Sequence, residues 1–165
     1  MAVDKSYIGR TTSRSRVTIE RGPVANFARA VKDESPVYRD PGAAKSAGFA
    51  SIPAPPTFGF VAAFWGSFPE QQPPPEAGMA NPFVEVIGAL ARKGGIVLHG
   101  EQEFVYHRTI LVGDVLRGEG KVVDLYEKES KGKTMTFVVT ETVYRDEKTL
   151  EPVLTMRFNL VHRSA

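Results

Sequence analysis

The chain has 165 residues, enough for one domain that buries roughly 70% of its unfolded surface. With 42% hydrophobic and 24% charged residues it has the composition of an ordinary globular protein, and the basic residues behind its net charge of +2 are scattered among acidic ones. No basic run or aromatic-interleaved stripe indicates nucleic-acid binding. Cysteine is absent, which excludes disulfides, thiolate nucleophiles and cysteine-ligated metals.

No membrane segment is expected, because no apolar run approaches the ~18 residues that span a bilayer. Residues 1–16 are polar and lack the apolar core of a signal peptide. We therefore expect a cytoplasmic protein. The three histidines have no metal-ligand spacing, so neither a metal nor another cofactor is expected.

The first part of the chain predicts a short strand followed by a helix. Residues 17–20 alternate apolar and polar side chains. Pro23 suits the first turn of a helix, and apolar residues then recur at helical spacing up to Val31. This helix is expected to end near Asp33, because Pro36 pushes the residue before it out of the α region.

Two further segments are predicted from proline, glycine and apolar content. Pro41 opens a second short helix, with Gly48 as its candidate left-handed C-cap. Residues 57–65 are apolar at nearly every position, and a helix of this kind is usually buried. Residues 69–82 hold five prolines and are expected to form a loop.

From Gly95 onward the pattern changes to period two and predicts a strand meander. Tight connections are expected at Gly113 and Gly132, and a longer hairpin loop at residues 146–149. The four predicted strands cover residues 97–107, 115–127, 134–145 and 153–161. Helices first and strands later indicate an α+β fold in which an antiparallel sheet covers one apolar helix, in a single domain spanning residues 1–165.

Five motifs occur in order along the chain: Y-I-G-R, F-A-R-A-V-K-D-E-S-P-V-Y-R-D-P, A-P-P-T-F, L-H-G-E-Q-E-F-V-Y-H-R and V-G-D-V-L. With this layout the chain resembles the hot-dog fold of the MaoC-like hydratases and dehydratases. More narrowly, it is similar to the FAS1-like dehydratase, or MaoC N-terminal-type, family, which includes actinobacterial (3R)-hydroxyacyl-ACP dehydratase subunits. The resemblance covers nearly the whole chain.

The resemblance implies reversible addition of water to a trans-2-enoyl thioester of coenzyme A or acyl carrier protein. That reaction needs a group to activate water, an acid to protonate C2 and donors for the enolate-like oxygen. Active relatives supply the first two from an Asp and a His five residues apart, in a motif of the form D-x-x-P-[VI]-H. They supply the third from a backbone N–H at the start of the hot-dog helix, where free N–H groups point at developing negative charge.

Against that pattern the chain keeps Asp33 and Pro36 but has Tyr38 in place of the histidine. A phenol with a pKa near 10 is a poor general base at neutral pH, although it can still donate a hydrogen bond. By the same resemblance, Pro56 falls on the glycine whose amide would face the oxygen, and proline has no N–H. A shift of one residue would place Thr57 there instead. The candidate catalytic residues are Asp33, Tyr38 and His99.

Each candidate has a structural alternative. Asp33 would cap the Pro36 turn or pair with Arg29 or Arg39, Tyr38 would be a wall residue with its hydroxyl tied to backbone, and His99 would be a hydrogen-bonded structural histidine. His107 is expected at the surface or an interface, and His162 in a fraying C-terminus. The candidate substrate-binding residues are core residues or line an acyl tunnel: Pro56, Thr57, Phe58, Phe60, Phe64 and Trp65.

Three functions stay open at this point. The first is a substrate-holding, non-catalytic subunit of an (R)-specific enoyl-thioester hydratase or 3-hydroxyacyl-thioester dehydratase, paired with a MaoC-like catalytic hot-dog subunit. The second is a self-sufficient homodimeric hydratase that uses Asp33. The third is a non-enzymatic acyl-thioester binding protein. All three imply an acyl-CoA or acyl-ACP ligand, and pairing into a dimer through a sheet edge would remove the liability of an exposed edge strand.

Overall fold

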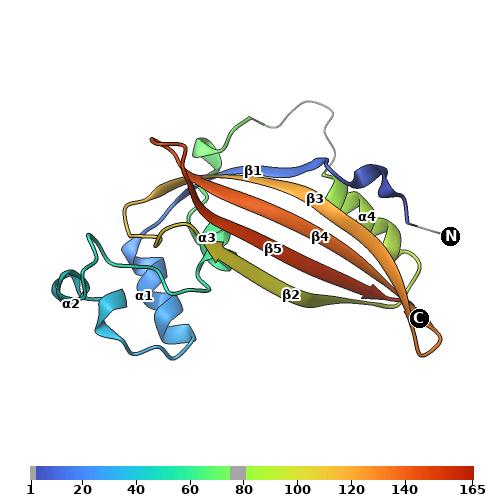
Figure 1. The fold of residues 1–165 in the computed structure, drawn as a ribbon, viewed down its shortest axis with the longest axis horizontal. Coiled ribbons are helices and arrows are strands. Elements are labelled where there is room, and N and C mark those ends of the chain that lie inside the picture. The colour runs from blue at the N-terminus through green and yellow to red at the C-terminus, as the bar shows by residue number, and fades with distance from the viewer. Residues whose placement is uncertain (1–2, 75–80) are drawn as a thin grey trace.

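A computed structural model describes residues 3–74 and 81–165 of the protein and is dominated by one antiparallel sheet (Figure 1). Its strands are β1 (Thr11–Thr18), β2 (Ile96–Tyr106), β3 (Val115–Ser130), β4 (Lys133–Asp146) and β5 (Pro152–Arg163). Their order across the sheet is β1-β3-β4-β5-β2. With helices packed on one face only, this is the expected hot-dog fold.

All four predicted strands occur within a few residues of their expected bounds, and β3, β4 and β5 form the expected meander. Strand β2 departs from it, because it pairs with β5 and not with β3, so the tight connection expected at Gly113 does not join two neighbouring strands. The long β3–β4 hairpin is closed by a two-residue turn, with Ser130 paired to Lys133. Lys131 and Gly132 both adopt positive φ, at 51° and 74°. Such φ values favour the primed turns that match the twist of the flanking strands, which sets the hairpin register.

Alternation along β3 gives the sheet an inner and an outer face. Leu116 and Val122 are buried, whereas Arg117, Glu119 and Lys121 between them are exposed. A bulge after Val122 shifts the phase, so that beyond it the odd-numbered positions point inward. The inner face therefore stays apolar from Leu116 as far as Leu125.

Two helices lie along the inner face (Figure 1): α3 (Gly59–Trp65) and α4 (Pro82–Ala91). The apolar helix at residues 57–65 is thus confirmed as α3. Helix α4 was not predicted, because its first residue, Pro82, was assigned to a proline-rich loop. The rest of the predicted loop at residues 69–82 is described as a short turn, η3 (Pro69–Gln71), residues 72–74 and Asn81, while residues 75–80 lie outside the described residues.

Helix α4 does carry sequence signals for its start and its buried face. The Asn81 side chain accepts a hydrogen bond from the Phe83 N–H at 3.0 Å, and Pro82 occupies the first turn. Val86 and Leu90, one turn apart, are buried in a cluster with Leu125 and Val138 of the sheet. The helix therefore covers the end of the sheet that α3 leaves open.

A helical lobe extends beyond one end of the strands (Figure 1). It contains α1 (Arg21–Ala30), η2 (Pro36–Tyr38) and α2 (Pro41–Ser46), while a short turn, η1 (Lys5–Tyr7), precedes β1. As predicted, α2 begins at Pro41 and is followed by Gly48 with a φ of 88°. The carboxylate of Asp40 caps it by accepting the Ala43 N–H at 2.6 Å.

The expectation that the apolar helix is buried all round is wrong for one of its sides. Phe58, at the entry to α3, is 1% exposed and belongs to the main core. Phe64 is 74% exposed and Trp65 is 42% exposed. Inner-face packing covers only part of a helix circumference, so the remaining apolar side chains of α3 face outward from this chain.

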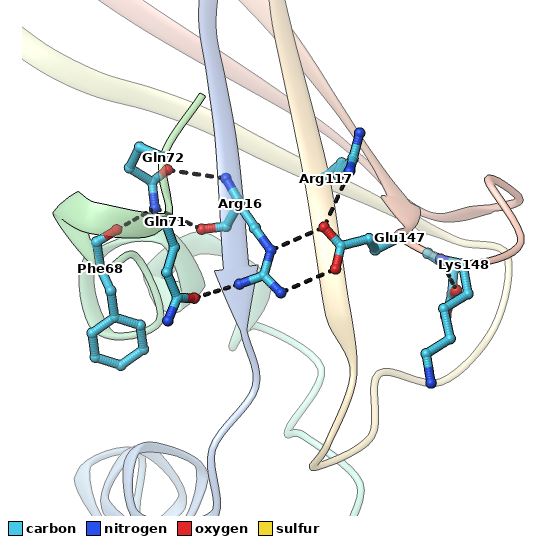
Figure 2. A network of polar contacts seen from close by, with 8 residues as sticks. Arg16, Phe68, Gln71, Gln72, Arg117, Glu147 and Lys148 are labelled. Atoms are coloured by element: carbon cyan, nitrogen blue, oxygen red, sulfur yellow. Dashed lines mark hydrogen bonds and ion pairs between the residues drawn. The ribbon is translucent and has the colours of Figure 1, made fainter. Parts of the chain in front are cut away.

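The two edge strands of the sheet differ in how far their outward backbone groups are hydrogen-bonded within the chain. The backbone of Arg16 in β1 is bonded by the side-chain amide of Gln72, which accepts its N–H at 3.0 Å and donates to its carbonyl at 3.0 Å (Figure 2). Farther along, Thr18 donates its N–H to Gly66 at 2.8 Å. Gln72 is itself held by the Phe68 carbonyl at 2.9 Å. Part of the β1 edge is therefore already satisfied from within the chain.

Strand β2 forms the opposite edge and pairs only with β5 among the described residues. Five of its large apolar side chains are between 38% and 46% exposed: Ile96, Val97, Leu98, Val105 and Tyr106. An uncovered apolar edge of this length is the kind of edge that natural proteins pair or cover.

Candidate functional site

Asp33 lies in the turn that leaves α1, where its carboxylate has a local role. The residue before it, Lys32, has a φ of 58°, and the Asp33 N–H donates to the Ala28 carbonyl at 2.8 Å. Oδ1 of Asp33 accepts the N–H of Ser35 at 3.0 Å, as in an Asx-turn. Among the described residues no ion pair joins Asp33 to Arg29 or Arg39. The observed geometry is the turn cap that the sequence offered as one alternative.

Tyr38 closes η2 immediately after this turn. Burial raises the pKa of its phenol above the ordinary value, and the nearby negative charge of Asp33 raises it further. Both effects act against ionisation, which leaves the phenol a hydrogen-bond donor at neutral pH. Among the described residues its hydroxyl forms no hydrogen bond, so the expected tie to backbone is not observed.

The entry to α3 is shaped by Pro56 and Thr57, which precede the helix. Phe58 donates its N–H to Pro55 at 2.9 Å, which makes a tight turn. The Tyr106 hydroxyl of β2 donates to the Pro56 carbonyl, and burial raises the pKa of Tyr106 to about 12. The Thr57 N–H has no acceptor within the described part of the chain. Of Pro56 and Thr57, Thr57 is therefore the residue whose backbone N–H can donate a hydrogen bond to a ligand.

Tyr106 was not singled out from the sequence, although its motif was. It stacks on Phe104, two residues earlier on the same face of β2, with ring centroids 6.2 Å apart and an interplanar angle of 13°. Alternation within the F-V-Y-H-R segment would have placed these two rings together, and a tyrosine beside a packed ring needs a partner for its hydroxyl. Tyr106 thereby ties the open edge strand to the helix entry.

His99 belongs to an aromatic cluster on the inner face rather than to a hydrogen-bonded pair. Its ring centroid lies 4.5 Å from Phe158 of β5 and 5.3 Å from Phe60 of α3. Phe64 joins through Phe60 at 6.3 Å, and Phe83 of α4 joins through Phe158 at 6.1 Å. Among the described residues the His99 ring makes no hydrogen bond, which contradicts the expectation of a hydrogen-bonded structural histidine. The cluster adjoins the open β2 edge.

A second aromatic group joins the helical lobe to the inner face. Phe27 of α1 contacts Phe58 edge-on at 5.6 Å and Trp65 at 6.2 Å. Phe58 and Trp65 thus anchor the lobe, whereas Phe60 contacts His99 of β2 and Phe64 contacts Phe60. The candidate substrate-binding residues of α3 are therefore divided between two sides of one helix.

The predicted catalytic residues are brought together only in part. Asp33 and Tyr38 are close enough for the Asp33 charge to act on the phenol. Within the described residues, no hydrogen bond or ring contact joins either of them to His99 or to α3. The same residues contain no cluster of three or more His, Asp or Glu side chains that would hold a metal ion.

The other two histidines have structural contacts. His107 is exposed, and its Nε2 lies 3.0 Å from the Thr155 hydroxyl. His162 was expected in a fraying terminus, but β5 runs to Arg163 and His162 is only 3% exposed. Its Nε2 lies 2.7 Å from the Gly94 carbonyl oxygen, which can only accept a hydrogen bond.

In the described part of the chain, no helix has the length and apolarity to cross a bilayer.

Comparison with known proteins places this geometry in a family. Residues 6–156 match the family described as FAS1-like, dehydratase domain region. A UPF0336 protein of Saccharopolyspora erythraea is 34% identical over 164 residues, which cover 99% of this chain and 93% of that protein.

Two solved structures from Mycobacterium tuberculosis share the fold. The ChsH1-ChsH2 complex has a TM-score of 0.71 at 22% identity, covering 92% of this chain and 83% of that chain. The C-terminally truncated HadBC (3R-hydroxyacyl-ACP dehydratase) complex has a TM-score of 0.64 at 21% identity, covering 92% of this chain and 96% of that chain. With a family match over most of its length and the expected fold, the chain belongs to the FAS1-like dehydratase family.

Proposed function

We propose that this chain is the substrate-holding, non-catalytic subunit of an (R)-specific enoyl-thioester hydratase or 3-hydroxyacyl-thioester dehydratase. A MaoC-like partner with an intact Asp–His pair supplies the acid–base chemistry. This chain contributes the wall of the acyl site and completes the sheet. The observation that carries the proposal is the Asp33–Tyr38 turn.

That turn supports a structural role better than an acid–base role. The Asp33 carboxylate accepts the Ser35 N–H and so stabilises the chain reversal before Pro36. Tyr38 stands where a histidine would exchange protons near pH 7, and both burial and Asp33 move its pKa away from that range. A general base must accept a proton at the working pH, which a phenol of raised pKa does poorly.

The open side of the inner face supports a partner subunit. Strand β2 leaves apolar side chains uncovered along its edge, and ring contacts through Phe60 and His99 link the exposed Phe64 ring to this strand. The two solved structures that share the fold are complexes, ChsH1-ChsH2 and HadBC. We infer that a second hot-dog subunit pairs with β2 and covers α3, so that the rings of α3 line the acyl chain near the subunit boundary.

Hydration assays on the chain alone and with a partner test the proposal. The full chain is purified alone and is also co-expressed with the MaoC-like protein that co-purifies with it. Hydration of crotonyl-CoA is followed by loss of the enoyl-thioester absorbance. We expect no turnover above the uncatalysed rate from the chain alone, and turnover from the complex. In the complex, Asp33→Asn in this chain leaves kcat within about twofold, because no proton passes through Asp33.

The alternatives give different results in the same assays. Strong hydration by the pure chain that is abolished by Asp33→Asn would establish a self-sufficient homodimer and overturn the proposal. Binding of crotonyl-CoA without turnover in any pairing would indicate a non-enzymatic acyl-thioester binding protein. A matched Asp40→Asn variant, which alters the cap of the neighbouring helix α2, controls for disturbance of the lobe.

A further inference from the structure

A pocket of about 490 Å³ lies on the outer face of the sheet, over β1, β3 and β4. The candidate catalytic and substrate-binding residues lie in the helical lobe or on the inner-face helix and strand, so this pocket is separate from the proposed acyl site. Its volume is within the ~300–1,000 Å³ range of small-molecule sites. No part of the proposed dehydratase chemistry requires it.

The lining of the pocket is strongly cationic. Five cationic side chains contribute to it, against the two carboxylates of Glu119 and Glu141. Glu141 accepts from Arg157, which lies outside the lining, at 2.7 Å, whereas Glu119 lies 3.7 Å from the ammonium of Lys121, which is itself one of the five. The five cationic side chains are Arg14, Arg16, Arg117, Lys121 and Arg145.

One wall is held rigidly by a polar network (Figure 2). Glu147 accepts from Arg16 through two bonds, Nε to Oε1 at 2.9 Å and Nη2 to Oε2 at 3.0 Å. The same carboxylate accepts from Nε of Arg117 at 3.2 Å, and Gln71 accepts from Nη1 of Arg16. These bonds hold the pKa of Glu147 below its usual range, chiefly through Arg16. One carboxylate thus orients two guanidinium groups and leaves an excess positive charge beside the pocket.

Arg145 supplies a cation without a compensating carboxylate. Its Nη1 donates to the Leu150 carbonyl at 3.3 Å, and among the described residues it has no ion-pair partner. The Arg117 side chain is 64% exposed, and Glu147 engages it only through Nε, so its terminal amino groups can bind an anion. Guanidinium groups bind phosphate oxygens in a bidentate manner and stack on planar rings.

Apolar groups complete the pocket beside these cations. Three apolar residues line the pocket: Val143 of β4, Leu150 of the β4–β5 loop and Pro73 of the segment after η3. The Leu150 side chain is 59% exposed. An inorganic anion alone would leave this surface uncovered. An organic phosphate with a planar or apolar body fits both parts of the lining.

We propose that this outer-face pocket binds a nucleoside phosphate, with the phosphate on Arg117 and Arg145 and the base against Val143 and Leu150. The concave shape and apolar floor favour a small ligand over an acidic protein surface. Five segments of the chain line the pocket, residues 14–16, 71–73, 117–121, 141–145 and 150, and both Gln72 and Glu147 fix the first of them by bonding to Arg16.

Isothermal titration calorimetry on the isolated full chain tests the site without any partner subunit, so its result is independent of the proposed enzymatic role. The probes are AMP, inorganic phosphate and adenosine. We expect saturable binding of AMP, binding of inorganic phosphate about tenfold weaker, and no binding of adenosine. Arg145→Glu should weaken AMP binding by at least about tenfold, corresponding to loss of one charge-assisted contact of ~1.4 kcal/mol.

Lys128→Glu is the matched control, since it makes the same charge change on β3 but outside the pocket, where the ammonium lies 5.3 Å from the Tyr126 ring. Its AMP affinity should stay within about twofold of wild type. Arg117→Glu provides a second pocket variant if Arg145→Glu does not fold. No saturable AMP binding, equal binding of adenosine, or wild-type affinity in both pocket variants would each overturn the proposal. The proposal would also be overturned if the chain bound an acidic polypeptide through Arg145 and did not bind AMP.

Discussion

Replacing Phe64 by alanine separates the stability of the chain from the stability of its assembly. Phe64 is 74% exposed on the outward side of α3. A phenylalanine buries ~200 Å² when fully covered, so about a quarter of that, ~50 Å², is buried within the chain. At ~25 cal/mol per Å², truncation should lower the free energy of unfolding of the isolated chain by only ~1 kcal/mol.

The effect on association should be larger. If a partner covers half of the ~150 Å² that Phe64 leaves exposed, the lost burial is ~2 kcal/mol, which weakens association about thirtyfold. Phe58 is the matched comparison, because it is the same residue type at the start of the same helix but is 1% exposed. Phe58→Ala should cost ~3–5 kcal/mol of folding free energy, since it leaves a core cavity.

Two measurements on each variant test this reasoning. Urea denaturation gives the free energy of unfolding, and sedimentation equilibrium gives the dissociation constant of the complex with the co-purified partner, or of the homodimer. The reasoning would be refuted if Phe64→Ala destabilised the isolated chain as much as Phe58→Ala. Unchanged association of Phe64→Ala would show that the α3 face lies outside the interface.

Two further predictions concern the β1 edge and its polar network. Gly66→Ala should destabilise the chain by ~1–3 kcal/mol in thermal denaturation, because an added Cβ would lie 2.3 Å from the Thr18 carbonyl oxygen. The control is Gly22→Ala, where an added Cβ meets nothing within 4 Å, and this variant should be at least as stable as wild type. Equal effects of the two substitutions would contradict the predicted clash. The pKa of Glu147 is lowered in the folded chain, chiefly by Arg16, so its stabilising contribution is present above its unfolded pKa and is lost as the pH falls through the folded value. Glu147→Gln should therefore lower stability at pH 7 and flatten the loss of stability in acid, as measured by urea denaturation across pH. Glu151→Gln, an exposed change in the same loop, should keep the wild-type acid profile, and an unchanged profile for Glu147→Gln would count against the network.

Local patterns predicted much of the sheet correctly. Strands β3 and β4 follow from alternation, and their connection follows from the Lys131–Gly132 pair, because both signals act between near neighbours. Helix α2 follows from Asp40 and Pro41 for the same reason. Helix α4 was missed because Pro82 is compatible both with a loop and with a first helical turn, and only its packing on Leu125 and Val138 distinguishes the two.

For the candidate site, the sequence identified the altered Asp33–Tyr38 loop and the apolar helix. It did not reveal that Asp33 caps its own turn, that the Tyr106 hydroxyl holds the Pro56 carbonyl, or that His99 packs among aromatic rings. Each of these facts depends on the direction of a side chain within a turn or across the fold. Periodicity gives the face on which a residue lies but not the atom that it meets.

By itself, then, the sequence determined the family, the β3–β4–β5 meander and the substitution of tyrosine for the expected histidine, because each is a matter of residue identity or short-range spacing. The tertiary structure alone decided that one side of α3 and the β2 edge remain uncovered, and that five cationic side chains surround one outer pocket. The residues that build these surfaces are distant in the chain. Only the folding of the sheet and the docking of its loops bring them to one place.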